Sequence, residues 1–306
     1  MSHKTDTAYE ASLKSIETEN YIDRLFFRPI GFLIAKWLSH TGITPNMVTV
    51  FSIFVGAVVG PLFYFRYIYY TLPGILCFIM ANLLDCVDGQ LARLTNRKSK
   101  IGRILDGLAG DIWFFLIYVF LAIRLKNEFD SWLFFIPAVL SGISHLVQAN
   151  ITDYYKTLHL YFISKEKGSE FQNYDEVCME YKQKQPGIEK KLFFVYLYYV
   201  SLQQSLTPQL QKMLKYLHAK YGDTFPENIR LDFRKNSSKL MKVYIDRMTF
   251  NSRAIFLFLS VLTGYVWFYF VFEIIILNIV LFISMFKHEK ICTLITMKDE
   301  ANGFGN

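Results

Sequence analysis

Residues 85–111 read DCVDGQLARLTNRKSKIGRILDGLAGD, and this stretch joins the ends of two strongly apolar segments. It holds Asp85, Asp88, Asp106 and Asp111. A carboxylate at the end of an apolar segment is costly unless something compensates its charge. The stretch therefore predicts a site for divalent metal ions at a membrane surface.

The composition of the whole chain is typical of a membrane protein. Of the 306 residues, 53% are hydrophobic and 17% aromatic, and the mean hydropathy is +0.24. Several windows approach the roughly 20 apolar residues that cross a bilayer core. The net charge of +7 suits anionic lipids or phosphorylated substrates, whereas the apolar segments argue against nucleic-acid binding. The four cysteines show no CxxC spacing, so neither a zinc site nor a disulfide framework is supported.

The predicted fold is all-α: a polytopic membrane protein with six transmembrane helices, preceded by an interfacial amphipathic helix. Residues 24–40 form the interfacial helix, which is favoured over a first span because the segment is short and basic. Thr44 is the expected N-cap of the first span, with Pro45 at its first helical position. The expected spans are 47–65, 72–94, 104–125, 132–152, 254–271 and 273–286, and the last two form a tight hairpin.

Four regions follow from this pattern. They are a polar N-terminal tail (1–23), the interfacial helix with spans one to four and the Asp stretch (24–155), a helical cytoplasmic insertion (156–248), and the last two spans with a basic tail (249–306). Within the insertion, Thr207-Pro208 and Pro226 begin helices, and Gly222 ends the first of them. The run LFFVYLYYV at 192–200 is either a buried face of the insertion or an interfacial helix.

The termini and the Asp stretch are expected on the cytoplasmic side of the membrane. The polar start has no apolar segment typical of a signal peptide, and six spans from a cytoplasmic N-terminus return the C-terminus to the same side. The segments placed there are rich in Lys and Arg, as the positive-inside rule requires, although Arg124 and Lys126 fall in a loop placed outside.

The spacing of the acidic residues places three carboxylates where they could share a site. Asp85 and Asp88 lie about 60° apart on a helix, and Asp106 shares a face of the next helix with Gly102. Oxygen ligands from two helices suit Mg²⁺ or Mn²⁺. Arg93 borders the acidic face and suits phosphate. For any single aspartate, helix capping or pairing with a nearby arginine is the simpler interpretation, whereas the set favours a metal site.

The pattern Asp85-x2-Asp88-Gly89-x2-Ala92-Arg93-x8-Gly102-x3-Asp106 resembles the signature of the CDP-alcohol phosphotransferases (CDP-alcohol phosphatidyltransferases), membrane enzymes that build phospholipids. The resemblance extends to the interfacial helix, the GITPN entry to the first span and the six-span plan, and leaves out the insertion. It implies that Asp85, Asp88 and Asp106 bind two Mg²⁺ or Mn²⁺ ions, which hold the diphosphate of a CDP-linked donor. It also implies that Gly89, Ala92 and Arg93 contact the cytidine diphosphate part, and that the protein is a homodimer.

The chain departs from the family at the last position of the pattern. Gly110 stands where the family has an aspartate proposed as the base, and Asp111 follows it. In a regular helix Asp111 points about 140° away from Asp106. We therefore expect a π-bulge near 107–110 that brings Asp111 to the metal site as a further ligand and as the catalytic base.

Three more polar residues are weaker candidates for contact with the acceptor: His145, Gln148 and Arg253. Hydrogen bonding between helices, or an Arg253 side chain reaching lipid headgroups, would explain them equally well.

The function that these expectations favour is transfer of a substituted phosphoryl group, a phosphatidyl group, from a CDP-linked lipid donor to a small polar alcohol acceptor in the membrane, with release of CMP. One alternative is a CDP-ethanolamine or CDP-choline phosphotransferase that acts on diacylglycerol. The other is a divalent-cation transporter, which the position of the carboxylates near span ends disfavours, since transporter sites lie near the midplane.

Overall fold

The computed structural model describes residues 8–15, 17–164, 168 and 170–303, and these residues form helices and turns with no strand. The all-α prediction is confirmed. The contacts divide the chain into two units, residues 1–147 with 250–276 and residues 148–249 with 277–306. The functional division into tail, core, insertion and closing spans stays a prediction.

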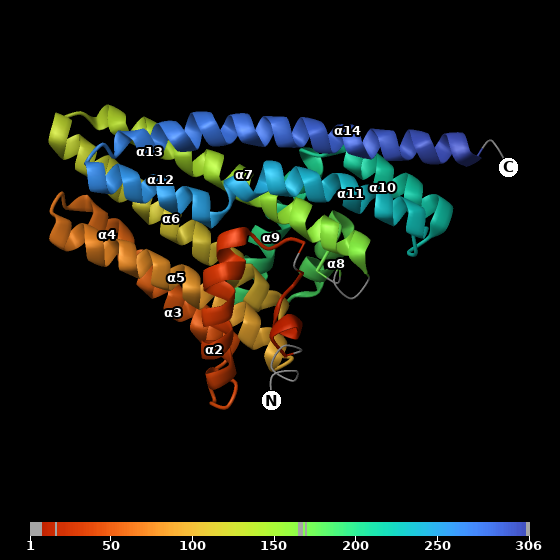
Figure 1. Cartoon of the computed structure of the whole chain (residues 1–306), viewed down its shortest axis with the longest axis horizontal. Helices are drawn as coiled ribbons and strands as arrows, with labels where there is room; N and C mark the ends of the chain where they lie inside the picture. Colours follow the sequence, from red (N-terminus) through yellow and green to blue (C-terminus); the bar gives the residue numbers. More distant parts are fainter. Residues whose placement is uncertain (1–7, 16, 165–167, 169, 304–306) are drawn as a thin grey trace. The chain divides into compact units, whose positions relative to one another are not determined.

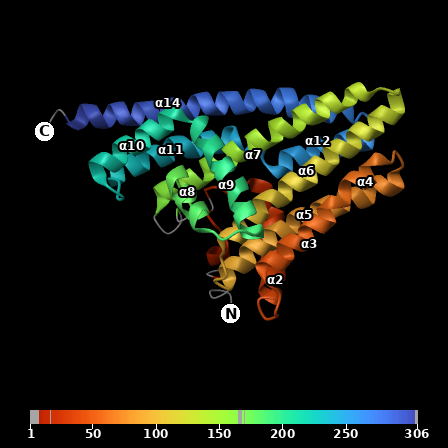
Figure 2. The ribbon, with the colours of Figure 1, turned by 180° about the vertical axis from the view of Figure 1, so that it is seen from behind.

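The first unit holds the predicted site. Helices α3, α5 and α6 run side by side in both views of the ribbon (Figures 1 and 2). Its elements are η1 (Asp23–Phe27), α2 (Arg28–Leu38), α3 (Pro45–Ala57), α4 (Val59–Tyr64), α5 (Ile68–Leu94), α6 (Lys100–Phe129), η2 (Trp132–Phe134), the first part of α7 (Phe135–Ile163), α12 (Phe250–Thr263), α13 (Trp267–Val271) and η4 (Phe272–Ile276).

Capping residues begin the helices that lead to the site. The predicted N-cap of α3 is confirmed, because Thr44 accepts a hydrogen bond from the Met47 backbone amide at 3.4 Å and Pro45 follows it. Ser99 caps α6 by accepting from the Gly102 amide at 2.9 Å. Each cap satisfies a backbone amide that has no partner within its own helix. Gly56 lets α3 approach α6 closely, since a Cβ there would lie 2.2 Å from the Trp113 ring.

Helix α2 packs on the half of α5 that carries the Asp motif. A buried cluster joins three helices, with Ala35 and Leu38 from α2, Val48 from α3, and Val87 and Leu91 from α5. The opposite face of α2 is apolar but exposed, with Leu33 and Trp37 at 66% and 68% exposed. A helix with exposed apolar side chains is therefore present where we expected the interfacial helix, and its location at the membrane interface stays a prediction.

Within the described part of the chain, five helical segments are long and apolar enough to cross a membrane: Pro45–Tyr64, Ile68–Leu94, Lys100–Phe129, Trp132–Ile163 and Trp267–Ala301. A shorter apolar helix, Phe250–Thr263, stands where we expected the fifth of six spans. The count of six spans therefore depends on whether this shorter helix crosses the membrane, and it stays a prediction.

The boundary predicted between the last two spans is wrong. We placed it between Val271 and Glu273, as a tight hairpin. The chain instead turns at Gly264, whose φ of 83° suits glycine, and the next helical segment continues through Glu273. Glu273 pairs with Arg253, so its charge is compensated inside the protein.

The second unit consists of α7 from residue 148 onward, α8 (Tyr174–Gln183), α9 (Ile188–Ser205), α10 (Pro208–Tyr221), α11 (Glu227–Val243), η3 (Ile245–Met248) and α14 (Leu277–Gly303). The predicted starts of α10 and α11 and the end of α10 at Gly222 are confirmed. Helices α10 and α11 lie along α14 (Figures 1 and 2).

The apolar run at 192–200 forms part of α9 and divides between two faces. Phe193 and Val200 are buried, whereas Phe194 and Tyr198 are 59% and 69% exposed. One face of α9 thus belongs to the core of the second unit, and the exposed face has the aromatic character of an interfacial helix.

Candidate metal centre and active site

Three of the four predicted aspartates come together. Asp85 and Asp88 on α5 and Asp106 on α6 each offer a carboxylate oxygen, and these three oxygens lie within 4.8 Å of one another. The three charges would repel one another without a cation between them. Hard oxygen donors so arranged fit Mg²⁺ or Mn²⁺.

Helix α3 supplies a neutral partner for this cluster. The Thr49 hydroxyl donates to Asp88 Oδ2 at 2.5 Å, and both residues are nearly fully buried, at 2% and 4% exposed. Such a bond fixes the orientation of a metal-binding carboxylate. Spacing along the chain did not single out Thr49, because its partner is 39 positions away.

The glycine of the motif on α6 allows a second contact from α3. A Cβ at Gly102 would lie 2.6 Å from Asn46 Oδ1 and 2.9 Å from Ser99 Oγ. A larger residue at 102 would displace the Asn46 side chain and the Ser99 hydroxyl that caps α6. Asn46 belongs to the GITPN entry to the first span, whose spacing alone assigned it no role.

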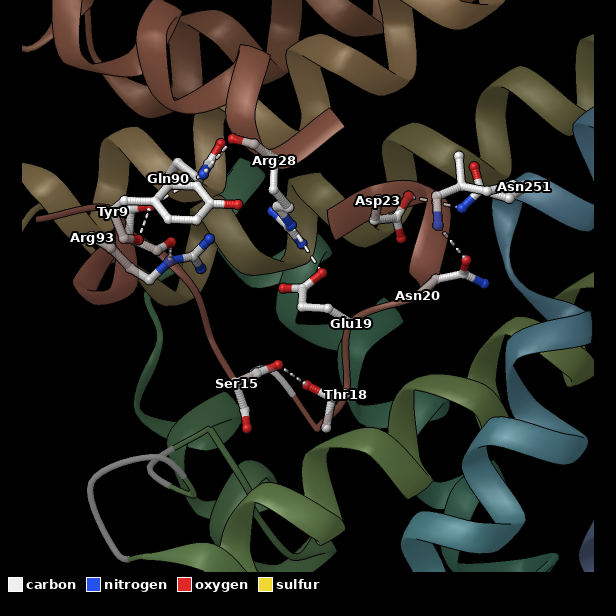
Figure 3. Close-up of polar contacts among 12 residues, drawn as sticks. Tyr9, Ser15, Thr18, Glu19, Asn20, Asp23, Arg28, Gln90, Arg93 and Asn251 are labelled. Carbon is white, nitrogen blue, oxygen red and sulfur yellow. Dashed lines mark hydrogen bonds and ion pairs between the residues drawn. The ribbon is translucent and has the colours of Figure 1, made fainter. Parts of the chain in front are cut away.

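The residues predicted to contact cytidine diphosphate lie on α5 beside the cluster. Gly89 and Ala92 are half-buried. The guanidinium of Arg93 lies over Gly89, since a Cβ there would be 3.3 Å from Nη2 and 3.6 Å from Nη1. Arg93 Nε donates to the backbone carbonyl of Ser12, from the N-terminal segment (Figure 3). The cation thus borders the acidic face, as the spacing predicted, and the Ser12 contact was not foreseen.

The predicted π-bulge is absent, so the bulge prediction is wrong. Helix α6 is α-helical from Lys100 to Phe129, and π-helical turns occur instead at Asp23–Phe27 and Phe272–Ile276. Asp111 therefore lies outside the group formed by the other three aspartates, with Oδ1 3.7 Å from His145 Nε2. The regular helix removes the geometric reason for counting Asp111 as a metal ligand.

Open space remains on α6 between Asp106 and Asp111. A Cβ at Gly107 or at Gly110 would meet no other atom within 4 Å. Gly110 is four residues after Asp106, and Asp111 is four residues after Gly107, so each glycine shares a face with one aspartate. The side chain of Asp111 is 22% exposed and borders this space.

The other polar candidates mostly bond to neighbouring helices. Arg253 forms a buried ion pair with Glu273, with side chains 2% and 0% exposed. Arg253 Nη1 also lies 2.9 Å from His145 Nδ1, and Tyr118 is 3.2 Å from the same nitrogen. In the second unit, Gln148 Nε2 donates to Asn278 Oδ1 at 2.8 Å. These contacts match the interhelical interpretation of His145 and Gln148. Arg253 is held inside the first unit and does not extend to lipid headgroups.

Comparison with known proteins finds similarity to one family over the part of the chain that carries the site. The sequence model of the CDP-alcohol phosphatidyltransferase family matches residues 42–168, which include the three clustered aspartates. An archaetidylinositol phosphate synthase of Pyrococcus horikoshii (strain ATCC 700860 / DSM 12428 / JCM 9974 / NBRC 100139 / OT-3) is 38% identical over 73 residues. That match covers 24% of this chain and 37% of the relative.

Proposed function

We propose that this protein, whose residues 42–168 match the CDP-alcohol phosphatidyltransferase family model, transfers a phosphatidyl group from CDP-diacylglycerol to a small polar alcohol and releases CMP. The observation that carries the proposal is the convergence of Asp85, Asp88 and Asp106 from two helices within 4.8 Å. The apolar helices around them would keep the lipid part of the donor in the membrane.

In this proposal the clustered aspartates and Arg93 have different roles in binding the donor. Asp85, Asp88 and Asp106 would hold two divalent ions, which would supply positive charge to the diphosphate and to the departing CMP. Thr49 keeps Asp88 in its binding orientation. Arg93 contributes a cation over Gly89, beside the carboxylates that would hold the diphosphate.

The transfer is a substitution at phosphorus. The acceptor oxygen forms a bond to the phosphorus that carries the diacylglycerol group, the bond from that phosphorus to the CMP oxygen breaks, and CMP leaves with the electron pair. The hydroxyl proton passes to a carboxylate, for which Asp111 is our proposed base. In a regular α6 this requires the acceptor to occupy the open space beside Gly107 and Gly110.

A phosphorylated polyol is the proposed acceptor. The residues between the two parts of the motif include Arg97, Lys98, Lys100 and Arg103, a group of cations suited to a phosphate. The name of the archaeal relative, an archaetidylinositol phosphate synthase, agrees with an acceptor of this class.

The test is CMP release by the purified protein with Mg²⁺ and a panel of substrates. CDP-diacylglycerol is offered with myo-inositol 1-phosphate, glycerol 3-phosphate and unphosphorylated myo-inositol. CDP-ethanolamine and CDP-choline are each offered with diacylglycerol. We expect release with CDP-diacylglycerol and a phosphorylated polyol. Release with CDP-ethanolamine or CDP-choline alone would favour the alternative phosphotransferase. No release with any donor, together with Mn²⁺ flux into proteoliposomes, would favour a transporter.

A further inference from the structure

The N-terminal segment contacts the face of α5 that carries Arg93. Ser12 is fully buried. Its carbonyl oxygen accepts from Arg93 Nε, and its hydroxyl accepts from Gln90 Nε2 at 3.1 Å. Gln90 and Arg93 are three residues apart and therefore neighbours on the helix surface. Figure 3 shows both side chains turned toward this segment.

Anchors on both sides of Ser12 hold the segment in place. On one side, the Tyr9 ring packs edge-on against Phe32 of α2, with centroids 5.4 Å apart. On the other, Glu19 accepts from Arg28 Nε at 2.9 Å. The Glu19 and Arg28 side chains are 6% and 16% exposed, so loss of either would leave a largely buried charge without its partner.

Gln90 connects these anchors to the motif helix. The same Nε2 atom that contacts Ser12 also lies 3.1 Å from the Arg28 carbonyl oxygen and donates to it. Ser12 and Arg28 therefore both accept hydrogen bonds from the side-chain amide of Gln90 on α5. A shift of either anchor would be transmitted to the position of Ser12, and so to Arg93.

The contact with Ser12 sets the direction of the Arg93 side chain. A guanidinium is a rigid planar fork, so holding Nε at the Ser12 carbonyl also fixes the positions of Nη1 and Nη2. Those two nitrogens lie over Gly89, next to Asp88 of the carboxylate cluster. The Nη1 and Nη2 atoms of the guanidinium therefore lie on the side where we expect the diphosphate to bind.

The group that Ser12 offers to Arg93 is a backbone carbonyl, not an anion like a substrate phosphate. An inhibitory segment would offer Arg93 an anion, whereas Ser12 offers a neutral backbone carbonyl, and Glu19 pairs with Arg28 instead. The segment also precedes residues 42–168, the part that matches the family. We propose that Tyr9, Ser12 and Glu19 form an N-terminal clamp, a positioning element that orients Arg93 for the CDP part of the donor. This inference rests on the function proposed above.

The experiment measures CDP binding to the full-length protein with Mg²⁺ by calorimetry, alongside steady-state kinetics. Glu19→Ala removes one anchor and Tyr9→Leu weakens the other, so the second variant also serves if the first folds poorly. Glu10→Ala, an exposed acidic residue of the same segment, is the matched control. Each variant is made in the unmodified protein and in an Arg93→Ala background.

If the clamp acts through Arg93, Glu19→Ala and Tyr9→Leu should raise the dissociation constant for CDP and the donor KM. The expected change for Glu19→Ala is about 10-fold, as for a hydrogen bond to a charged group. The acceptor KM and the Glu10→Ala control should not change. In the Arg93→Ala background, neither anchor variant should weaken CDP binding further, because the residue through which the clamp acts is gone.

Three results would refute the clamp without refuting the proposed function. They are unchanged CDP affinity in both anchor variants, an equal further loss in the Arg93→Ala background, and a rise in activity on removal of an anchor, which would mean inhibition. Failure of the unmodified protein to bind CDP with Mg²⁺ would refute the proposed function, and the clamp with it.

Discussion

Asp111 follows the position where the family pattern has its last aspartate, and it is the proposed base. We expect Asp111→Asn to slow CMP release by roughly 100-fold or more, the usual contribution of a general base. A carboxylate at 110 would share the face of Asp106 and meet open space. Gly110→Asp in the Asp111→Asn background is therefore expected to restore part of the rate.

The control for this pair of variants is Asp130→Asn at the far end of α6, where a φ of 48° suits asparagine as well as aspartate. An unchanged rate in Asp111→Asn would exclude Asp111 as the base. The proton would then have to pass to another group of the site.

Thr49 is expected to support the proposed metal site through its hydrogen bond to Asp88, without binding the ion itself. Thr49→Val keeps the shape of the side chain and removes the 2.5 Å hydrogen bond to Asp88. We expect the Mg²⁺ concentration for half-maximal rate to rise by roughly 10-fold to 100-fold, as for other outer partners of metal ligands. Thr71→Val, at a buried threonine near the other end of α5, should leave it unchanged. Equal shifts in the two variants would mean that Thr49 acts only through general stability.

The residues of the site differ in how far the sequence revealed them. Asp85, Asp88 and Asp106 could be grouped from helical spacing and from the two helices that carry them. Thr49 and Ser12 could not, because their contacts with Asp88 and Arg93 join positions 39 and 81 apart. Local periodicity carries no information about such pairs.

At the scale of the elements, the two closing helices show that an apolar pattern predicts a helix more reliably than it predicts the position of a turn. The sequence predicted two closing helices, and both are present. Nothing in the sequence distinguished Gly264, where the chain turns, from the other glycines. The predicted turn lay instead next to Glu273. The ion pair with Arg253 could not be read from the sequence, and it is what allows the helical segment to continue.

This ion pair has a measurable consequence for stability. Glu273→Leu would leave Arg253, which is 2% exposed, without its carboxylate partner. We expect a loss of about 3–5 kcal/mol, seen as a lower midpoint of thermal unfolding in detergent. The double variant Arg253→Leu, Glu273→Leu should recover most of that loss, because both charges are removed together. A double variant as unstable as the single one would show that the pair is not the cause.

At the scale of the whole molecule, sidedness follows from the count of spans. If α5 crosses the membrane, Arg66 before it and Lys98 after it lie on opposite sides. Lys235 in α11 should lie with Lys98, because the insertion is predicted on the side of the site. In a variant with all four cysteines replaced by serine, we introduce Arg66→Cys, Lys98→Cys and Lys235→Cys one at a time.

A membrane-impermeant maleimide is then added to sealed vesicles of known orientation. We expect Lys98→Cys and Lys235→Cys to label together, and Arg66→Cys to label from the opposite side. Labelling of Arg66→Cys and Lys98→Cys from one side would contradict a crossing by α5. Separate sides for Lys98→Cys and Lys235→Cys would contradict an even number of crossings between them.

The central claim is that the carboxylate cluster binds the divalent ions that hold a CDP-linked donor. The most direct measurement is the rate of Mg²⁺-dependent CMP release from CDP-diacylglycerol by Asp85→Asn, compared with the unmodified protein at equal amounts of folded enzyme. Our account predicts a loss of at least about 100-fold, beyond the effect of losing an outer partner such as Thr49. Release by Asp85→Asn at the unmodified rate and with the same Mg²⁺ dependence would contradict it.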